Sequence, residues 1–237
     1  MHYRLSQARV NFSVSSRFGP TGCIARVFAL AAGEVLVQAK WAIMGIPLFP
    51  TANRFEVLDR AIEAAPPEGL WLEFGVWKGE SLDYLAQKTQ GAVYGFDSFE
   101  GLPSNWGVLG IGLRRGAFAT TPPSGLRANV RLVPGRFEHS LPAFLTDHPG
   151  ESAAFVHIDC DLYLSAKAVL SALAPRIVPG TVLVFDDSFA ESVIGNDESR
   201  AWAETTRNYR IRARWITSSA SGSVAAQVVK VDHALDS

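Results

Sequence analysis

From residue 55 onward, short apolar runs of strand length alternate with stretches in which apolar residues recur at helical spacing. The strand-like runs cover residues 70–75, 92–98, 130–134, 154–159 and 181–186. The helical patterns cover residues 56–65, 81–88, 141–146 and 165–177. Strands separated by helices of this length are typical of parallel βαβ units, which form a sheet with helices on both faces.

The pattern changes near the carboxyl end of the chain. A helical stretch at 198–206 is followed by strand-like runs at 209–217 and 223–231, which only the short turn SSASGS separates. This connection is too short for a crossover helix, so the two runs should pair antiparallel. The pattern predicts a doubly wound α/β fold, mostly parallel, with a C-terminal antiparallel hairpin.

Residues 22–50 are rich in apolar side chains, but Arg26, Glu34 and Lys40 divide them into runs shorter than a membrane span of about 20 residues. We therefore expect no membrane-spanning helix, with contact to a membrane surface as the alternative. An amphipathic helix that caps the site or packs on a second subunit fits this stretch better. We divide the chain into a helical cap or oligomerisation segment, residues 1–54, and a main domain, residues 55–237, and we expect a homo-oligomer, with a dimer favoured.

Charge and cysteine content narrow the function further. The 22 Lys and Arg residues nearly balance the 23 Asp and Glu residues, which argues against nucleic acid and favours a small-molecule partner. Cys23 and Cys160 are the only cysteines, and Cys160 lies within the motif HIDCD, so a disulfide-stapled secreted protein is not indicated. We expect a cytoplasmic protein.

The first strand-like run ends in EFGVWKG, residues 73–79, directly before a helix. Glycines at such a turn let the backbone approach a ligand, although they can also be purely steric. The second run ends at Asp97, and a carboxylate there can accept hydrogen bonds from both hydroxyls of a ribose. Together the two features favour a cofactor that contains a nucleoside.

Aspartates stand at the ends of the strand-like runs 154–159 and 181–186, in HIDCDLY and VFDDS. If these consecutive strands lie side by side, Asp159 and Asp186 converge at one edge, with Asp187 beside them. Several carboxylates at one edge repel one another unless a cation is present, and all-oxygen ligation suits Mg²⁺ or another divalent cation. The alternative is that Asp161, Asp186 and Asp187 cap the following helices or turns.

In order and spacing, LEFGVWKGES, YGFDSFEGLPSNW, RRGAF, HIDCDLY and VFDDS resemble the class I S-adenosylmethionine-dependent O-methyltransferases of the macrocin (TylF-like) type, over residues 55–190. The resemblance implies a Rossmann-like methyltransferase fold and metal-dependent methylation of a hydroxyl on a sugar or glycosylated natural product. It implies two cofactors, S-adenosylmethionine and Mg²⁺.

The resemblance also implies a role for individual residues. It assigns Glu73 and Gly75 to the methionine end of the cofactor and Asp97 to its ribose. The other residues that it places around the cofactor are Gly79, Ser98, Phe99, Gly135, Arg136, Phe137 and Asp159.

The same resemblance makes Asp159, Asp186 and Asp187 the metal ligands and Asp161 the general base, so that Asp161 and Asp159 carry catalysis. Residue 162 is a leucine where the catechol-type relatives have a lysine, which favours a sugar acceptor. Methylation of a catechol-like or other small-molecule hydroxyl remains an alternative. A nucleotide-binding oxidoreductase or an inactive relative is another.

The segment between the second and third strands, residues 99–129, is too long for a simple connection in a compact domain. We interpret it as a lid over the acceptor. Its Arg114 and Arg115 can meet an anionic group of the acceptor or be solvated. We consider His157 and His139 weaker candidates for catalysis.

Overall fold

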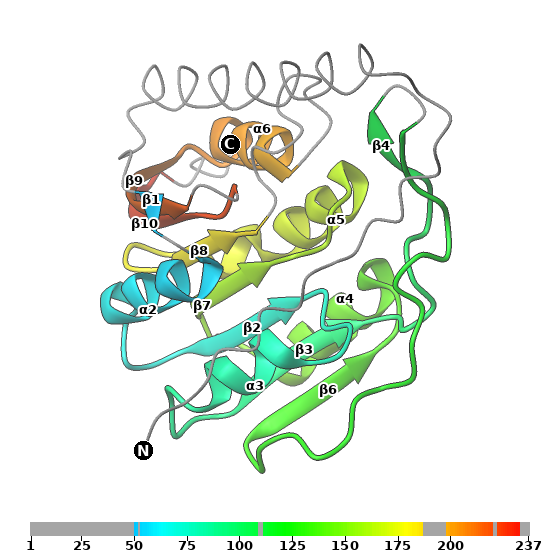
Figure 1. Cartoon of the computed structure of the whole chain (residues 1–237). Coiled ribbons are helices and arrows are strands. Elements are labelled where there is room, and N and C mark those ends of the chain that lie inside the picture. Colours follow the sequence, from blue (N-terminus) through cyan, green and yellow to red (C-terminus); the bar gives the residue numbers. More distant parts are fainter. Residues whose placement is uncertain (1–49, 52, 109–110, 187–197, 220–221, 233–237) are drawn as a thin grey trace. The chain divides into compact units, whose positions relative to one another are not determined.

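The computed structural model describes residues 50–51, 53–108, 111–186, 198–219 and 222–232, all of which fall in one compact unit of the chain, residues 37–237. Its core is a sheet with the strand order β1-β9-β10-β8-β7-β2-β3-β6. The strands from β8 to β6 in this order are parallel, and β9 and β10 form an antiparallel hairpin that pairs with β8 (Figure 1). The predicted doubly wound fold with its terminal hairpin is confirmed.

The parallel strands are short and bounded as the apolar runs predict. They are β2 (Leu70–Phe74), β3 (Val93–Asp97), β6 (Val130–Pro134), β7 (Ala153–Ile158) and β8 (Val182–Phe185). The hairpin consists of β9 (Ile211–Ser219) and β10 (Val224–Val231), and the two-residue strand β1 (Pro50–Thr51) pairs in parallel with β9. Residues of β1 belong to the segment that we assigned to the N-terminal cap, yet they extend the main sheet.

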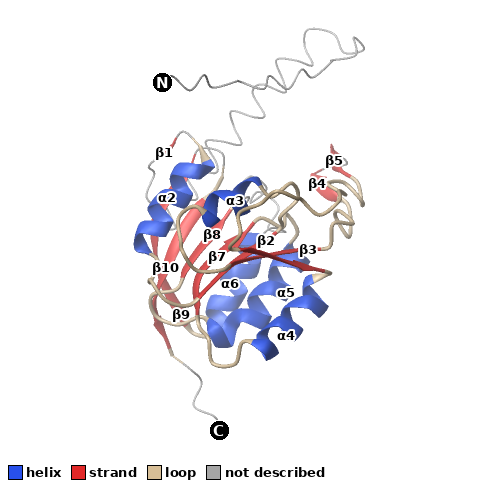
Figure 2. Cartoon of the chain, turned by 90° about the horizontal axis from the view of Figure 1, so that it is seen from below, coloured by secondary structure: helices blue, strands red, loops and turns tan. Residues whose placement is uncertain are grey.

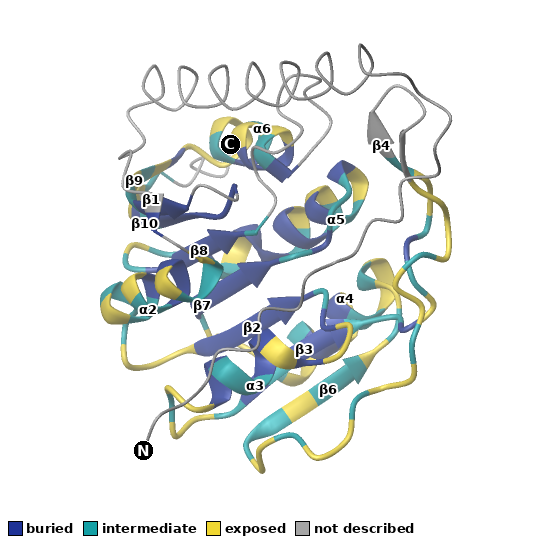
Figure 3. Cartoon of the chain, viewed as in Figure 1, coloured by how far each residue is buried: buried dark blue, intermediate teal, exposed yellow. Residues whose placement is uncertain are grey.

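Helices cover both faces of the sheet, as Figure 2 shows. On one face lie α2 (Arg54–Ala64) and α3 (Glu80–Ala86). On the other lie α4 (Phe137–Asp147), α5 (Tyr163–Leu173) with the 3₁₀ turn Ala174–Arg176, and α6 (Glu198–Asn208). Each face has its own apolar core, and β2, β7 and β8 are buried on both sides (Figure 3). Strands buried on both faces explain the continuous apolar runs of the sequence.

Two elements differ from the predicted pattern. Helix α4 begins four residues earlier than expected and contains Pro142, a residue type that seldom occurs in a helix interior. The segment 99–129 contains a small second sheet, in which β4 (Trp106–Val108) pairs antiparallel with β5 (Ile111–Leu113). These strands are too short for their side-chain pattern to be recognised in the sequence.

Within the described residues, no helix is both long enough and apolar enough to cross a membrane. The apolar stretch 22–50 lies almost wholly outside the described residues, so the expectation that it forms an amphipathic helix stays a prediction.

Candidate active site

A cavity of about 440 Å³ opens at the carboxyl ends of the parallel strands. The strand order reverses at β2, since β3 and β6 follow on one side of it and β7 and β8 on the other. In a doubly wound sheet this reversal leaves a crevice in which ligands bind. The cavity volume lies within the range of about 300 to 1,000 Å³ that is usual for small-molecule sites.

The turn after β2 is packed tightly against the end of β7. Gly75 has a φ of 96°, and a Cβ at this position would lie 1.8 Å from the carbonyl oxygen of Asp159. The amide of Asp159 in turn donates to the carbonyl of Phe74 at 2.9 Å. Only glycine therefore permits this approach, and the two loops that line the crevice are fixed relative to each other.

Asp97 organises the loops around the crevice. Its Oδ2 accepts hydrogen bonds from the backbone amides of Val76 (2.9 Å) and Trp77 (2.8 Å), and its Oδ1 accepts one from the amide of Phe99 (2.8 Å). These three bonds use three of the roughly four lone-pair positions of the carboxylate. Asp97 lines the cavity, as predicted, and keeps acceptor capacity on Oδ1 for a ligand hydroxyl.

Asp161 lies at the cavity in a rare backbone conformation. Its φ is 61°, and the amide of Leu162 donates to the carbonyl of Cys160 at 2.6 Å, which closes a γ-turn around Asp161. A non-glycine residue in such a turn stores about 1 to 3 kcal/mol of strain, and strain of this kind clusters at functional sites. The turn holds Asp161 between the end of β7 and the start of α5.

Asp159 and Asp186 converge, as the spacing predicted. Their strands are parallel neighbours, with Ile158 opposite Phe185, and Oδ2 of each carboxylate contacts the same nitrogen, Nη1 of Arg54. The distances from Nη1 are 3.2 Å to Asp159 and 2.8 Å to Asp186. No motif in the sequence pointed to Arg54.

This carboxylate pair fits a cation, since the guanidinium is itself a cation held by both Oδ2 atoms and the donor atoms are the oxygens that Mg²⁺ prefers. Asp187, the third predicted ligand, lies outside the described residues. Within the part of the chain that the structure describes, no three His, Cys, Asp or Glu side chains form a group that could hold a metal ion. The three-aspartate ligand set therefore stays a prediction.

Glu73, which the resemblance assigns to the cofactor, does not line the cavity. Its fully buried carboxylate accepts hydrogen bonds from His157 Nδ1 at 2.9 Å and from Ser81 Oγ at 3.2 Å. Burial lowers the pKa of His157, but the hydrogen bond and charge of Glu73 outweigh it, so the pKa is raised. Glu73 thus ties β2 to β7 and α3 beneath the glycine turn, and His157 belongs to this structural pair.

Two further predicted cofactor residues lie outside the cavity lining. Phe99 is buried in the core formed with α2 and α3. Gly79 has a φ of 79°, and a Cβ there would approach Pro123 and Leu126 of the 99–129 segment to 3.0 to 3.1 Å. Gly79 therefore lets that segment pack on the start of α3.

The remaining predicted cofactor residues do line the cavity: Gly75, Asp97, Ser98, Gly135, Arg136, Phe137 and Asp159. The amide of Gly135 donates to the Asp97 carbonyl at 2.9 Å, which joins the ends of β3 and β6. Phe137 packs edge-on against Phe74, with ring centroids 5.6 Å apart. Its ring offers a flat apolar surface at this end of the cavity.

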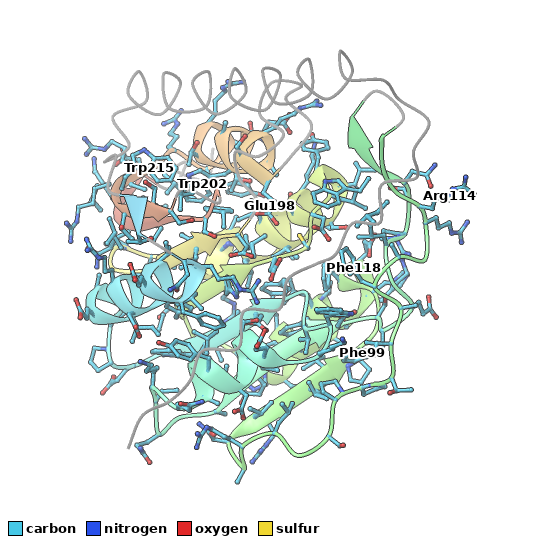
Figure 4. The ribbon with its side chains drawn as sticks, viewed as in Figure 1. Phe99, Arg114, Phe118, Glu198, Trp202 and Trp215 are labelled. Carbon is cyan, nitrogen blue, oxygen red and sulfur yellow. The ribbon has the colours of Figure 1, made fainter. Side chains whose placement is uncertain are left out.

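Aromatic side chains stand at the opening of the cavity. Trp77 and Phe118 both line it, are 44% and 42% exposed, and meet edge to face with centroids 5.8 Å apart. Phe118 comes from the 99–129 segment (Figure 4). Arg114 and Arg115 are exposed and do not line the cavity, and Arg114 points away from the body of the domain in Figure 4. Large exposed apolar groups at an opening are typical of a binding surface.

Acidic groups dominate the cavity wall. Among the residues that the structure describes, six carboxylates line it, against the two guanidinium groups of Arg54 and Arg136. Glu80, which lies within the motif LEFGVWKGES, and Glu138 belong to this set, although neither was assigned a role from the sequence. An acidic wall of this kind favours a ligand that carries positive charge.

Comparison with known proteins agrees with this geometry. Residues 72–188 match the family described as "Methyltransferase domain". A curated relative from Streptomyces olivaceus, 8-demethyl-8-(2,3-dimethoxy-alpha-L-rhamnosyl)-tetracenomycin-C 4'-O-methyltransferase, is 28% identical over 57% of this chain. The match spans 60% of the length of that relative.

Solved structures share the fold. The O-methyltransferase NovP is 23% identical with a TM-score of 0.57, over 75% of this chain and 80% of NovP. CalS11, a calicheamicin methyltransferase, is 21% identical with a TM-score of 0.53, over 83% of this chain and 91% of CalS11. MycE, from the mycinamycin pathway and in complex with Mg and SAH, is 13% identical with a TM-score of 0.53, over 82% of this chain and 55% of MycE.

The family match, the shared fold and the cavity at the reversal of strand order support one assignment. The resemblance to methyltransferases expected from the motifs is confirmed: residues 72–188 match a methyltransferase domain family, and the fold is shared with solved O-methyltransferases.

Proposed function

We propose that the protein transfers a methyl group from S-adenosylmethionine to a hydroxyl of a sugar or a glycosylated natural product. The observation that carries the proposal is the shared cavity: the Asp97-bound glycine turn and the strained Asp161 face the same space. The curated relative, a methyltransferase named for a rhamnosyl-tetracenomycin, supports the acceptor class.

The cofactor would lie between the ends of β2, β3 and β6. The free acceptor capacity of Asp97 Oδ1 suits a ribose hydroxyl, and Phe137 suits the flat adenine ring. The acidic wall suits the sulfonium and ammonium groups of S-adenosylmethionine. When bound, this cofactor supplies an electrophilic methyl group.

The acceptor would enter past Trp77 and Phe118, whose exposed rings can pack on an apolar part of it. Asp161 would remove the proton of the hydroxyl that is methylated. A positioned general base contributes about 10² to 10⁴ in rate. A hydroxyl is a poor nucleophile at neutral pH, so this proton transfer is the step that needs help from the protein.

We further propose that the reaction depends on a divalent cation, Mg²⁺ or a similar ion, held by Asp159 and Asp186 with Asp187. When bound, the ion lowers the pKa of a nearby hydroxyl and orients it. The convergence of two Oδ2 atoms on one cationic nitrogen supports this proposal. The orientation of the Asp186 side chain also supports metal binding. Ser223 Oγ donates to Asp186 Oδ1 at 2.8 Å, so Oδ2 of Asp186 faces Nη1 of Arg54.

Assignments for the ends of the chain also remain proposals. Residues 1–54 would cap the acceptor site or join two copies of the chain, the protein would form a homodimer, and it would act in the cytoplasm. The segment 99–129 would serve as the lid, since its Phe118 and Trp106 line the cavity.

Transfer of a labelled methyl group from S-adenosylmethionine to two sets of acceptors tests the proposal. One set consists of deoxysugar glycosides with a vicinal diol, and the other of catechols. We expect the label on the glycosides and a loss of transfer on addition of EDTA that Mg²⁺ restores. Label on the catechols alone would favour the alternative acceptor class, and transfer that is insensitive to EDTA would refute metal dependence.

A further inference from the structure

Arg54 reaches the two aspartates from a well-anchored helix. It is the first residue of α2, and Asn53 caps this helix by accepting hydrogen bonds from the amides of Phe55 (2.9 Å) and Glu56 (3.2 Å). Val57, Leu58 and Ala61 bury the other side of α2 against the sheet. The base of the Arg54 side chain is therefore fixed, while the residue lines the cavity.

The guanidinium neutralises repulsion between the two carboxylates. The side chains of Asp159 and Asp186 are only 21% and 11% exposed, so water screens their charges incompletely. A guanidinium stays protonated at any working pH, so Arg54 always brings a positive charge to the carboxylate pair.

The contact atoms are the ones that a divalent ion would need. Arg54 uses a single nitrogen, Nη1, to meet Oδ2 of both aspartates, instead of the two-nitrogen fork that a guanidinium offers to one carboxylate. Ser223 donates to the other oxygen of Asp186, so Oδ2 of Asp186 is the oxygen that faces Nη1 of Arg54. A divalent ion and the Arg54 guanidinium, placed together against these Oδ2 atoms, would repel each other strongly.

We propose that Arg54 is an internal cation that competes with the divalent ion for Asp159 and Asp186. The guanidinium holds the two carboxylates together without the ion and moves off their Oδ2 atoms into the cavity when the ion binds. Arg54 thereby weakens metal binding and sets the concentration at which the ion occupies the site. This inference rests on the metal dependence that we propose above.

Titration of the full-length chain with Mn²⁺ in a calorimeter, without cofactor or acceptor, tests the competition. Arg54→Met removes the charge and keeps an unbranched side chain, and we expect it to bind Mn²⁺ about ten-fold more tightly than the unmodified chain. Arg54→Lys keeps the charge without the guanidinium and should show intermediate affinity. Arg60→Met is the matched control, since Arg60 lies exposed on the same helix and the substitution changes net charge equally. It should leave the affinity unchanged.

Thermal unfolding gives a second readout that does not depend on activity. In EDTA, Arg54→Met should unfold at a lower temperature than Arg60→Met, because the two carboxylates then repel each other, and Mn²⁺ should remove this difference. Equal or weaker Mn²⁺ binding by Arg54→Met would overturn the inference, as would the absence of Mn²⁺ binding to either chain.

The failure of this inference is separable from the failure of the proposed function. If Arg54 is a permanent substitute for the metal, no chain binds Mn²⁺, methyl transfer continues in EDTA, and Arg54→Met abolishes it. If methyl transfer is absent altogether but Arg54→Met still binds Mn²⁺ more tightly, the competition stands and the proposed reaction falls.

Discussion

Gly75 and Asp159 touch backbone to backbone at the reversal of strand order: a Cβ on Gly75 would stand 1.8 Å from the carbonyl oxygen of Asp159. Gly75, which shapes the proposed cofactor turn, therefore also sets the position of Asp159, one of the two paired aspartates. The proposed cofactor turn and the carboxylate pair therefore meet through backbone atoms alone.

Gly75→Ala should displace the β2 turn or the Asp159 loop, because no flexible side chain can yield to the new methyl group. We expect a loss of stability well above the roughly 1 kcal/mol that a left-handed alanine costs by itself, together with weaker binding of S-adenosylhomocysteine. Gly150→Ala is the control: its φ is 77° and a Cβ there meets nothing within 4 Å. Equal destabilisation by the two substitutions, measured by urea unfolding, would show that the contact is unimportant.

Asp97 and Asp186 should have separate roles, Asp97 in cofactor binding and Asp186 in turnover. Asp97→Asn places an N–H₂ group where backbone amides now donate, and each lost charged bond costs about 1.5 to 3 kcal/mol. We expect the affinity for S-adenosylhomocysteine to fall by about 10- to 100-fold. Asp186→Ala should spare this affinity and abolish turnover. Calorimetry measures both affinities, and an equal loss in the two variants would contradict the division.

Asp161→Asn isolates the charge of the proposed base. Asparagine tolerates left-handed backbone, so the γ-turn around position 161 should persist. We expect turnover to fall by about 10² to 10⁴ with little change in cofactor affinity or melting temperature. A variant that keeps normal turnover would remove Asp161 from the mechanism.

Glu73 should matter for folding more than for cofactor contact. Glu73→Ala leaves the buried Nδ1 of His157 without its hydrogen-bond partner, which typically costs about 1 to 3 kcal/mol. Urea unfolding measures this loss, and Glu151→Ala, at an exposed loop position, should be close to neutral. If Glu73→Ala instead folds normally and only fails to bind S-adenosylhomocysteine, Glu73 contacts the cofactor, as the resemblance implies.

Most of the fold could be predicted because its signals are local. The strands β2, β3, β7 and β8 are continuous apolar runs, and the turn between β9 and β10 is too short for a crossover. The convergence of Asp159 and Asp186 followed from neighbouring parallel strands. Periodicity and connection length were sufficient for these inferences.

The rest of the site depends on contacts between distant residues. Arg54 lies 105 and 132 positions from its two aspartates, and nothing in its surroundings marks it as part of a site. Glu73 stands in a motif that suggested a ligand contact, but its partner His157 comes from the adjacent strand and draws the carboxylate inward. Which way a side chain turns at a strand end is decided by such partners, which a single sequence does not display.

Calorimetric titration of the full-length protein with S-adenosylhomocysteine, and separately with NAD, tests the central claim most directly. The account predicts saturable binding of S-adenosylhomocysteine that Asp97→Asn weakens, and no measurable binding of NAD. Binding of NAD without S-adenosylhomocysteine would contradict it and favour an oxidoreductase.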